Sequence, residues 1–348
     1  MYLMTPIKQN ISISVDAMGG DFGPEVTVPA AIQFLSKSKS SHNIVLVGIE
    51  EQIMPLIEQY QGGDLMESGR LSIYAASQVV EMDEAPAHAL KRKKDSSMRV
   101  SINLVKEGQT QACVSAGNTG ALMATARFVL KTITGINRPA ICSTMPCQDP
   151  NNTVHMLDLG ANVDSSPETL LQFAVMGSVL TEYVDTKQSP RVALLNVGAE
   201  EIKGSEKVKA AAVLLAESDL NYVGYIESDE IFHGKVDVIV CDGFEGNVAL
   251  KASEGVAKMI FDILKEEFKR NWLTKLIALT SMPILKAMKA RLDPRRYNGA
   301  TLIGLNGIVV KSHGGTDEFG FLHAIEEASR QAEMNVISHI GEKIKNTV

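Results

Sequence analysis

Short apolar runs alternate with longer amphipathic stretches along most of this 348-residue chain. The runs are rich in leucine and β-branched residues and end at Gly, Asn or Asp, which is typical of strands buried on both faces of a parallel sheet. We expect strands at residues 11–15, 43–47, 112–114, 154–157, 192–195, 236–240 and 308–310. Helical patterns occupy residues 119–131, 167–183, 205–218, 245–269 and 317–345. This alternation predicts a layered α/β fold with right-handed crossovers.

Six corners rich in glycine, asparagine or aspartate stand where apolar runs end. They are DAMGGD at 16–21, SAGNTGAL at 115–122, DLGAN at 158–162, NVGAEEIKG at 196–204, DGFEGN at 242–247 and SHGG at 312–315. A buried strand that ends in such a corner and leads into a helix presents free N–H groups at a positive dipole end. Ligands in layered α/β folds gather beyond the carboxyl ends of the strands. Phosphate is therefore the first ligand that we expect at these corners.

The composition favours a cytosolic protein with one or two domains. Hydrophobic residues make up 45% of the chain but aromatic residues only 5%, so a large aliphatic core can form. The four cysteines show no metal-ligand spacing, and we expect them to be reduced core residues. The first ten residues lack the features of a signal peptide. No stretch reaches the roughly 18 uninterrupted apolar residues of a membrane span.

Two mild breaks, TGINR at 134–138 and DPRRYNG at 293–299, suggest how the chain divides. We expect a flexible extension over residues 1–10 and a single catalytic unit over 11–348. Within that unit, residues of about 11–134 and 299–348 would form an outer lobe, and residues of about 135–298 an inner lobe.

Four consecutive cations, Lys91, Arg92, Lys93 and Lys94, contrast with the net charge of -7. The serines that follow are suited to cap the next helix. The run is either a solvated face, a docking patch for an acidic partner, or an entry for phosphate.

The segment 269–296 is strongly basic and amphipathic. It holds eight lysines and arginines against one acid, a net charge of +7, which leaves -14 for the remainder. Its apolar stripes predict two short helices broken at Pro283. The pattern favours peripheral insertion into an anionic membrane surface, and the alternative is a helical hairpin packed against the body or a dimer mate. The residues expected to make the contact are Trp272, Leu273, Leu276 and Ile277.

Seven phrases together carry a family resemblance. DAMGGD, SAGNTGALMA, RPA at Arg138, LDLGAN, NVGAEEIKG, DGFEGNVALK and GIVVKSHGG occur in the order and spacing of the PlsX family of phosphate acyltransferases, from about residue 11 to the C-terminus. The chain departs from the family pattern at Asn298, where glycine is usual.

The resemblance implies an acyltransferase that passes a long-chain fatty acyl group from acyl carrier protein to inorganic phosphate, giving acyl phosphate for phospholipid synthesis. It also implies a layered αβα Rossmann-like sandwich with two lobes and a cleft, related to phosphotransacetylases and to isocitrate and isopropylmalate dehydrogenases. A homodimer and contact with the membrane and with a downstream membrane glycerol-3-phosphate acyltransferase are further implications. The acidic partner of the basic run at 91–94 would then be the carrier protein. The residues themselves show no metal signature, and we expect no cofactor.

That reaction needs little acid–base chemistry. Phosphate is already a competent nucleophile at neutral pH, so the site must hold it beside the thioester carbonyl. Fixed N–H donors or a lysine would stabilise the developing oxyanion by about 3 to 4 kcal/mol each. A thiol with a pKa of about 8.5 leaves with little protonation.

Three side chains are candidates for catalysis. Lys203 would neutralise phosphate or the oxyanion, and Asn247 would donate to the same oxygen. His313 would protonate the leaving sulfur or bind phosphate. The plainer alternatives are a solvated lysine, a capping amide and a structural histidine. The residues expected to bind phosphate or substrate are Asp16, Gly19, Gly20, Asp21, Ser115, Gly117, Asn118, Thr119, Gly120, Asn162, Asn196 and Gly246.

Other functions explain the sequence less well. A phosphotransacetylase-like enzyme that uses acyl-CoA or a short acyl donor stays open, as does acyl transfer through a covalent Cys113. A nicotinamide-dependent dehydrogenase is disfavoured because DAMGGD is not a G-x-G-x-x-G fingerprint. A lipid-surface scaffold would leave the glycine corners unexplained, and we expect no nucleic-acid partner.

Overall fold

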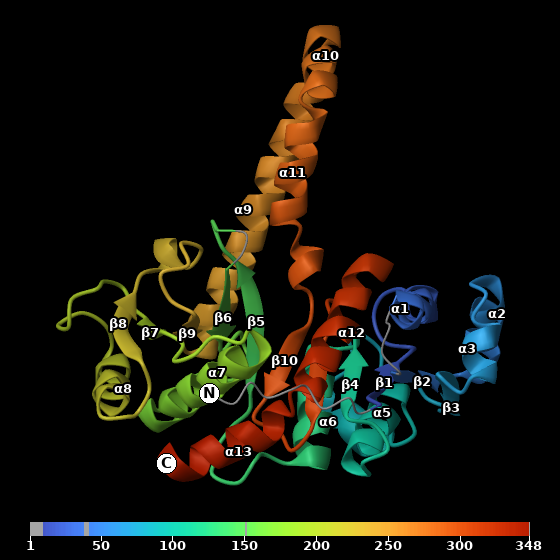
Figure 1. Cartoon of the computed structure of the whole chain (residues 1–348), viewed down its shortest axis with the longest axis horizontal. Coiled ribbons are helices and arrows are strands. Elements are labelled where there is room, and N and C mark those ends of the chain that lie inside the picture. Colours follow the sequence, from blue (N-terminus) through green and yellow to red (C-terminus); the bar gives the residue numbers. More distant parts are fainter. Residues whose placement is uncertain (1–9, 38–41, 150–151, 348) are drawn as a thin grey trace.

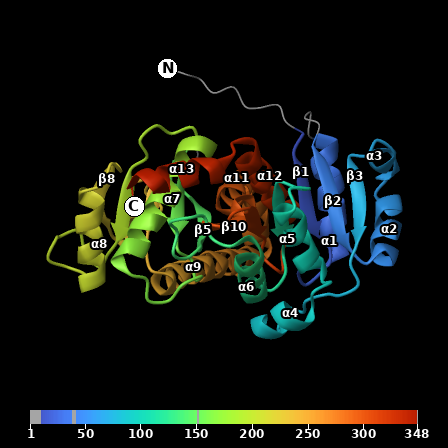
Figure 2. The same ribbon diagram turned by 90° about the horizontal axis from the view of Figure 1, so that it is seen from below.

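The computed structural model describes residues 10–37, 42–149 and 152–347. One eleven-stranded sheet crosses the molecule in the order β3-β2-β1-β4-β11-β10-β5-β6-β9-β7-β8. Helices cover both of its faces (Figures 1 and 2). The predicted layered α/β fold is therefore confirmed. The predicted extension over residues 1–10 lies outside the described residues, Asn10 excepted, and the lobe boundaries stay a prediction.

The sheet has an outer half, an inner half and two central strands. The outer strands are β1 (Ser12–Asp16), β2 (Asn43–Gly48), β3 (Leu71–Ala75), β4 (Ala112–Ser115) and β11 (Ile308–Lys311). The inner strands are β6 (Thr153–Leu157), β7 (Val192–Leu195), β8 (Tyr222–Ile226) and β9 (Val238–Val240). Neighbours pair in parallel within each half. The central strands are β5 (Ala140–Pro146) and β10 (Ala300–Ile303).

The two central strands reverse the direction of the sheet. β10 pairs antiparallel with β11 and with β5, and β5 pairs antiparallel with β6. The strand pattern is typical of a parallel sheet, but the pairing at the centre is antiparallel. β11 and β6 lie three strand spacings apart, about 14 Å, and run in opposite directions there. The carboxyl ends of outer and inner strands thus do not share one edge, and their corners form two groups.

Helix starts agree closely with the sequence pattern because polar caps mark them. The side chains of Ser96, Asn118, Ser166, Ser205 and Asp242 each accept a hydrogen bond from the first turn of the following helix. The helices on the sheet are α1 (Pro24–Lys37), α2 (Glu50–Gln59), α3 (Gly63–Glu67), α4 (Pro86–Arg92), α5 (Ser97–Lys106), α6 (Thr119–Leu130), α7 (Pro167–Val184), α8 (Glu206–Ala216), α12 (Glu318–Glu333) and α13 (Val336–Thr347).

The last predicted helix is wrong in one respect. The pattern over 317–345 predicts a single helix, whereas the chain forms α12 and α13. Asn335 lies between them with a φ of 48°, a left-handed conformation that ends α12.

The core is aliphatic and continuous through the centre of the sheet. One buried cluster underlies the outer half around Val15, and another underlies the inner half around Phe173. A third cluster includes Cys113 of β4 and Met156 of β6, so it joins the two halves. This core holds the two groups of corners in a fixed relation.

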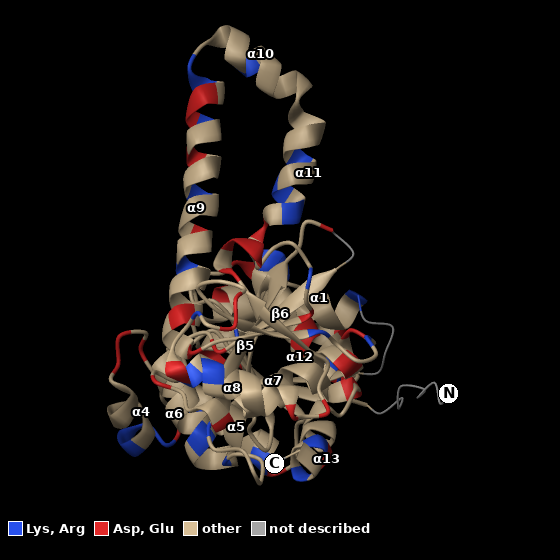
Figure 3. Ribbon diagram, turned by 90° about the vertical axis from the view of Figure 1, so that its left-hand side faces the viewer, with Lys and Arg blue, Asp and Glu red and all other residues tan. Residues whose placement is uncertain are grey.

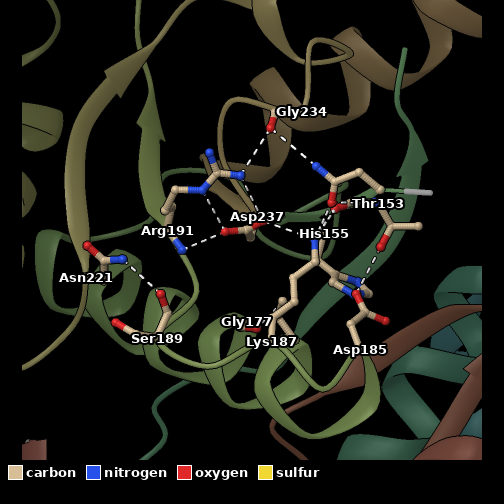
Figure 4. A network of polar contacts seen from close by, with 12 residues as sticks. Thr153, His155, Gly177, Asp185, Lys187, Ser189, Arg191, Asn221, Gly234 and Asp237 are labelled. Atoms are coloured by element: carbon tan, nitrogen blue, oxygen red, sulfur yellow. Dashed lines mark hydrogen bonds and ion pairs between the residues drawn. The ribbon is translucent and has the colours of Figure 1, made fainter. Parts of the chain in front are cut away.

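A network of charged groups ties the amino ends of the inner strands together (Figure 4). Asp237, directly before β9, accepts hydrogen bonds from Lys187 Nζ at 3.0 Å and from Arg191 Nε at 3.0 Å. His155 Nε2 lies 2.8 Å from Asp185 Oδ2 beside it. Burial by itself would raise the pKa of Asp237, but the Arg191 and Lys187 hydrogen bonds outweigh burial and lower it to about 2.

A long helical arm projects from the body (Figures 1 and 3). It consists of α9 (Gly243–Lys269), α10 (Trp272–Thr280) and α11 (Met282–Leu292). The predicted break near Pro283 is confirmed, since α10 ends at Thr280 and α11 begins two residues later. The hairpin is larger than predicted, because α9 forms its first side and α10 its tip. No described helix is both long and apolar enough to span a bilayer.

Candidate functional site

Three corners meet at the carboxyl ends of β1, β4 and β11, and we call residues 16–21, 115–120 and 312–315 the outer corner group. The Asp21 N–H donates to Gly314 O at 3.0 Å. The Ser312 N–H donates to Ser115 O at 2.9 Å. Most of the predicted phosphate-binding residues and His313 are therefore brought together here.

Asp16 lies at the buried centre of the outer corner group. Ser115 Oγ donates to its Oδ2 at 2.6 Å and accepts from the Gly117 N–H at 3.0 Å. Burial raises the pKa of Asp16, and the hydrogen bond from Ser115 and the charge of Lys311 act against that rise. Its other oxygen, Oδ1, is buried and has no hydrogen-bond partner within the described parts of the chain.

Glycine is required at two positions of this turn. A Cβ on Gly19 would lie 2.6 Å from Asp16 Oδ2 and 2.9 Å from the Gly117 nitrogen. Gly20 adopts a φ of 95°, where other L residues are strained. The DAMGGD turn is thus packed against SAGNTG rather than open around a ligand.

Lys311 is the functional candidate that the sequence reasoning missed. It ends β11 and is 8% exposed. Its ammonium group donates to Ala116 O at 3.2 Å and also to Ser312 O. Burial lowers the pKa of Lys311 to about 8, although the charges of Asp16 and Asp21 oppose the change. The available signal was a lysine at the end of an apolar strand, directly before a glycine corner.

The amino end of α6 lies near this lysine and is exposed to solvent. Asn118 caps the helix by accepting from the Ala121 N–H at 3.0 Å, and its amide donates to Met82 O and Glu84 O. Its side chain is therefore committed to structure. Thr119 and Gly120 are exposed in the first turn, so backbone N–H groups and the helix dipole face the surface there.

His313 lies on the surface of the last corner. Its Nδ1 accepts from the Gly315 N–H at 3.2 Å, and the backbone N–H of His313 donates to Asn298 Oδ1 at 3.0 Å. The Asn298 amide also donates to Ser312 Oγ and Gly320 O. The asparagine that departs from the family pattern thus holds this corner in place.

A second set of corners, residues 158–162 and 242–247, forms the inner corner group. Asp158 is buried and accepts from the N–H groups of Ile141 at 2.8 Å and Asn162 at 2.7 Å. The Ser165 N–H donates to Asp242 Oδ2 at 2.6 Å, which brings the starts of α7 and α9 together. Burial raises the pKa of Asp158, and these backbone hydrogen bonds oppose the rise.

Two residues predicted to bind substrate, Asn162 and Gly246, and the catalytic candidate Asn247 lie in this group. The amide of Asn162 donates to Pro139 O and Asp158 Oδ2, so its role is structural. Gly246 packs against Asp158 O with no room for a side chain. Asn247 is half-buried with its side chain next to Gly160. Of the three, only Asn247 presents a candidate donor.

Lys203 stands apart from the other catalytic candidates. Its ammonium lies 2.7 Å from Glu200 Oε2, and that hydrogen bond raises its pKa. The Asn196 amide donates to Lys203 O at 3.2 Å, so Asn196 shapes the loop. This corner follows β7, five strand spacings from β11 and thus about 24 Å along the sheet. Lys203 and His313 therefore do not form one cluster.

The basic run at 91–94 divides in the structure. Lys93 turns inward and donates to Glu84 Oε2 and Val79 O, both at 2.5 Å. Lys91, Arg92 and Lys94 are exposed. Only these three of the four cations remain available to a partner.

The part of the chain that the structure describes shows neither a metal site nor a reactive thiol. Within residues 10–37, 42–149 and 152–347, no group of three or more His, Cys, Asp and Glu side chains is arranged to hold a metal ion. Cys113 is fully buried in β4, and burial raises the pKa of its thiol. A thiolate nucleophile at Cys113 is therefore disfavoured.

Comparison with solved structures defines the class of fold. A phosphotransacetylase from Streptococcus pyogenes matches 93% of this chain and 94% of its own, with a TM-score of 0.60 and 17% identity. A branched-chain phosphotransacylase from Enterococcus faecalis V583 matches 92% and 99%, with a TM-score of 0.55 and 13% identity. At such identities the likeness concerns the fold, which is that of the phosphotransacylases, as the sequence resemblance implied.

Sequence comparison then identifies the family. The model of the family described as "Fatty acid synthesis protein" matches residues 11–339. A "Phosphate acyltransferase" of Hydrogenovibrio crunogenus is 56% identical over 97% of this chain and 98% of its own. Another, of Legionella pneumophila strain Paris, is 54% identical over 98% of each chain. This chain belongs to that family and is an acyltransferase, as its seven phrases predicted.

Proposed function

We propose that this enzyme transfers a long-chain fatty acyl group from acyl carrier protein to inorganic phosphate and so makes acyl phosphate for phospholipid synthesis. The names of its relatives support phosphate as the acceptor. The family description supports a fatty acyl donor. The observation that carries the proposal is the buried ammonium group of Lys311 beside the open amino end of α6, because together they favour an anion.

Phosphate binds at the outer corner group and attacks the thioester directly. One oxygen of hydrogen phosphate forms a bond to the carbonyl carbon, the carbon–sulfur bond breaks, and the phosphate proton passes to the departing sulfur. Thr119 and Gly120 supply backbone donors in this mechanism, and Lys311 supplies a positive charge. His313, exposed at the same corner, is placed to carry the proton.

The inner corner group has a supporting role in this proposal. Asn247 and Lys203 would contact the acyl donor rather than phosphate, because their corners follow the inner strands. If Asn247→Ala and Lys203→Ala both keep wild-type turnover, neither residue takes part in catalysis.

The decisive assay incubates the enzyme with acyl-loaded carrier protein, with and without phosphate. Acyl phosphate should form only with phosphate. Equal turnover of acyl-CoA and acyl carrier protein would favour the phosphotransacetylase-like alternative. A trapped acyl-enzyme that disappears in Cys113→Ala would show that acyl transfer passes through a covalent intermediate.

The arm supports peripheral contact of this cytoplasmic enzyme with an anionic membrane. At its tip Trp272 is 68% exposed, and Leu273, Leu276 and Ile277 are more than half exposed. Lys275 is the one charged residue of α10. Apolar side chains at a tip with basic flanks suit insertion among anionic headgroups. Replacing Trp272 and Ile277 by serine should abolish flotation with anionic liposomes, and unchanged flotation would assign the tip to another partner.

The sides of the arm support a homodimer. No residue of α10 or α11 is buried, and in α9 only Gly243 and Gly246 are. Apolar side chains along α9, including Met259 and Ile263, are about half exposed. A second copy would cover these side chains. Replacing Met259 and Ile263 by glutamate should give monomers in sedimentation velocity.

A downstream membrane acyltransferase is a further partner that the tip would bring near.

A further inference from the structure

A surface hollow lies between α4 and α6, on the outer half of the sheet. Its lining comes from the end of α4, from the second half of α6 and from the two residues that follow α6. The residues are Leu90, Ala124, Arg127, Phe128, Lys131 and Thr132. Two of them are basic and none is acidic. We call this feature the α4–α6 hollow.

The hollow lies in a basic part of the body. Residues 91–131 hold eight lysines and arginines and two acids, a net charge of +6, although the whole chain carries -7. Lysine and arginine segments are visible in α4 (Figure 3). Lys91 and Arg92 extend the charge of Arg127 and Lys131 across α4, and all four are exposed. Such a surface attracts an acidic partner and steers its approach.

Phe128 gives the hollow an apolar anchor. Its side chain is 53% exposed although it lies on a helix that packs against the sheet. The Arg99 guanidinium lies 5.2 Å from the ring centroid, and Lys131 Nζ lies 4.7 Å from it. The two cations hold the ring in place through its π face. An exposed aromatic residue ringed by cations is the composition expected of a binding hot spot.

The position of the hollow relates it to the outer corner group. α6 begins in that group at Thr119 and ends at Leu130, a length of about 17 Å at 1.5 Å per residue. α4 runs beside it from the start, since a Cβ on Gly120 would lie 3.0 Å from Pro86 Cγ. A donor that docks at the hollow must therefore deliver its acyl group on an arm that reaches the length of α6.

We propose that the α4–α6 hollow is the docking surface for an acidic acyl carrier protein, with Phe128 as anchor and Arg127, Lys131, Lys91 and Arg92 as its charged rim. This inference rests on the proposed acyl donor. The carrier's acidic helix lies on the hollow, and its flexible prosthetic arm runs along α6 to the outer corner group. The basic run that the sequence marks is thus one edge of a larger site, from which the inward-turned Lys93 is excluded.

The test measures carrier binding separately from turnover. Fluorescently labelled holo-carrier protein is titrated with the wild type, with the double variant Arg127→Glu and Lys131→Glu, and with Phe128→Ala. Lys345→Glu on α13 is the control, because it reverses an equally exposed charge elsewhere. The Kd of the double variant should rise by at least about tenfold, as like-charge contacts oppose association. The control should match the wild type, and circular dichroism confirms that each variant is folded.

Steady-state kinetics supply the second readout. In the double variant the KM for acyl carrier protein should rise much more than the KM for phosphate, since the outer corner group is untouched. Unchanged carrier binding in both hollow variants, or no binding to the wild type, would overturn the docking site. Failure of the wild type to make acyl phosphate, despite carrier binding, would instead refute the proposed function.

Discussion

Replacing Asp237 by asparagine removes one negative charge from the network at the amino ends of the inner strands. The carboxyl group is 8% exposed, whereas Lys187 and Arg191 are 28% and 41% exposed. The substitution keeps the shape of the side chain but leaves two cations with a neutral neighbour. Because these cations can turn to water, we expect a loss below the roughly 3–5 kcal/mol of a fully buried broken pair.

The pKa of Asp237 sets the magnitude. It is lowered to about 2 from an ordinary 3.8. A difference of one in pKa corresponds to about 1.4 kcal/mol, so the network stabilises the folded protein by about 2.5 kcal/mol. The folded pKa lies below the ordinary one, so this contribution is complete above pH 3.8 and is lost as the pH falls through about 2.

Urea unfolding followed by far-UV circular dichroism measures the effect. The lone tryptophan, Trp272, is exposed at the tip of the arm and would report poorly on the body. Asp237→Asn should lower the free energy of unfolding by about 2–3 kcal/mol at neutral pH. Glu230→Gln, which breaks the more exposed pair with Lys235, should cost less than about 0.5 kcal/mol. Equal losses in the two variants would refute the reasoning.

Three further predictions concern the outer corner group and the strands β4 and β11 that lead into it. Lys311→Met should lower kcat/KM for phosphate about 100-fold, whereas the control Lys345→Met should leave it unchanged. In the wild type, kcat/KM should fall as the pH rises through about 8, because the Lys311 ammonium group loses its proton there. If Lys311→Met has the same pH profile as the wild type, this lysine is not the titrating group. Gly19→Ala should lower the free energy of unfolding by about 1–3 kcal/mol, because its new Cβ would lie 2.6 and 2.9 Å from neighbouring atoms. In the control Gly63→Ala the new Cβ meets no atom within 4 Å, so this variant should be neutral or slightly stabilising in thermal or urea unfolding. Cys113→Ala should keep turnover within about twofold in the acyl phosphate assay, since a buried thiol is unreactive, and loss of turnover in a folded variant would contradict this.

Much of the secondary structure could be predicted because its signals are local. The strand at 112–114 and the start of the next helix follow from an apolar run and from the Asn118 cap. The bend of the arm follows from Pro283, which starts a helix readily but does not continue one. The prediction of a single helix over 317–345 is wrong at Asn335, because no glycine or proline in the sequence marks the break there.

The candidate site was predicted only in part. The glycine corners and His313 were identified, and the structure gathers most of them into the outer corner group. Lys311 was not predicted, because what makes it a candidate is the burial of its ammonium group, and the sequence of a strand end does not show whether a lysine is buried. Asn162 was expected to contact substrate, but its amide is used by Pro139 and Asp158.

The sequence by itself determined the layered α/β class, the glycine corners, the basic arm and the family. Only the tertiary structure decided that β5 and β10 reverse the sheet, that the corners form two groups, and that Lys93 turns inward while Phe128 stays exposed. The physical reason is the range of the interactions. Caps, turns and periodicity act within a few residues, whereas strand direction and the desolvation of a charge depend on contacts between segments far apart in the chain.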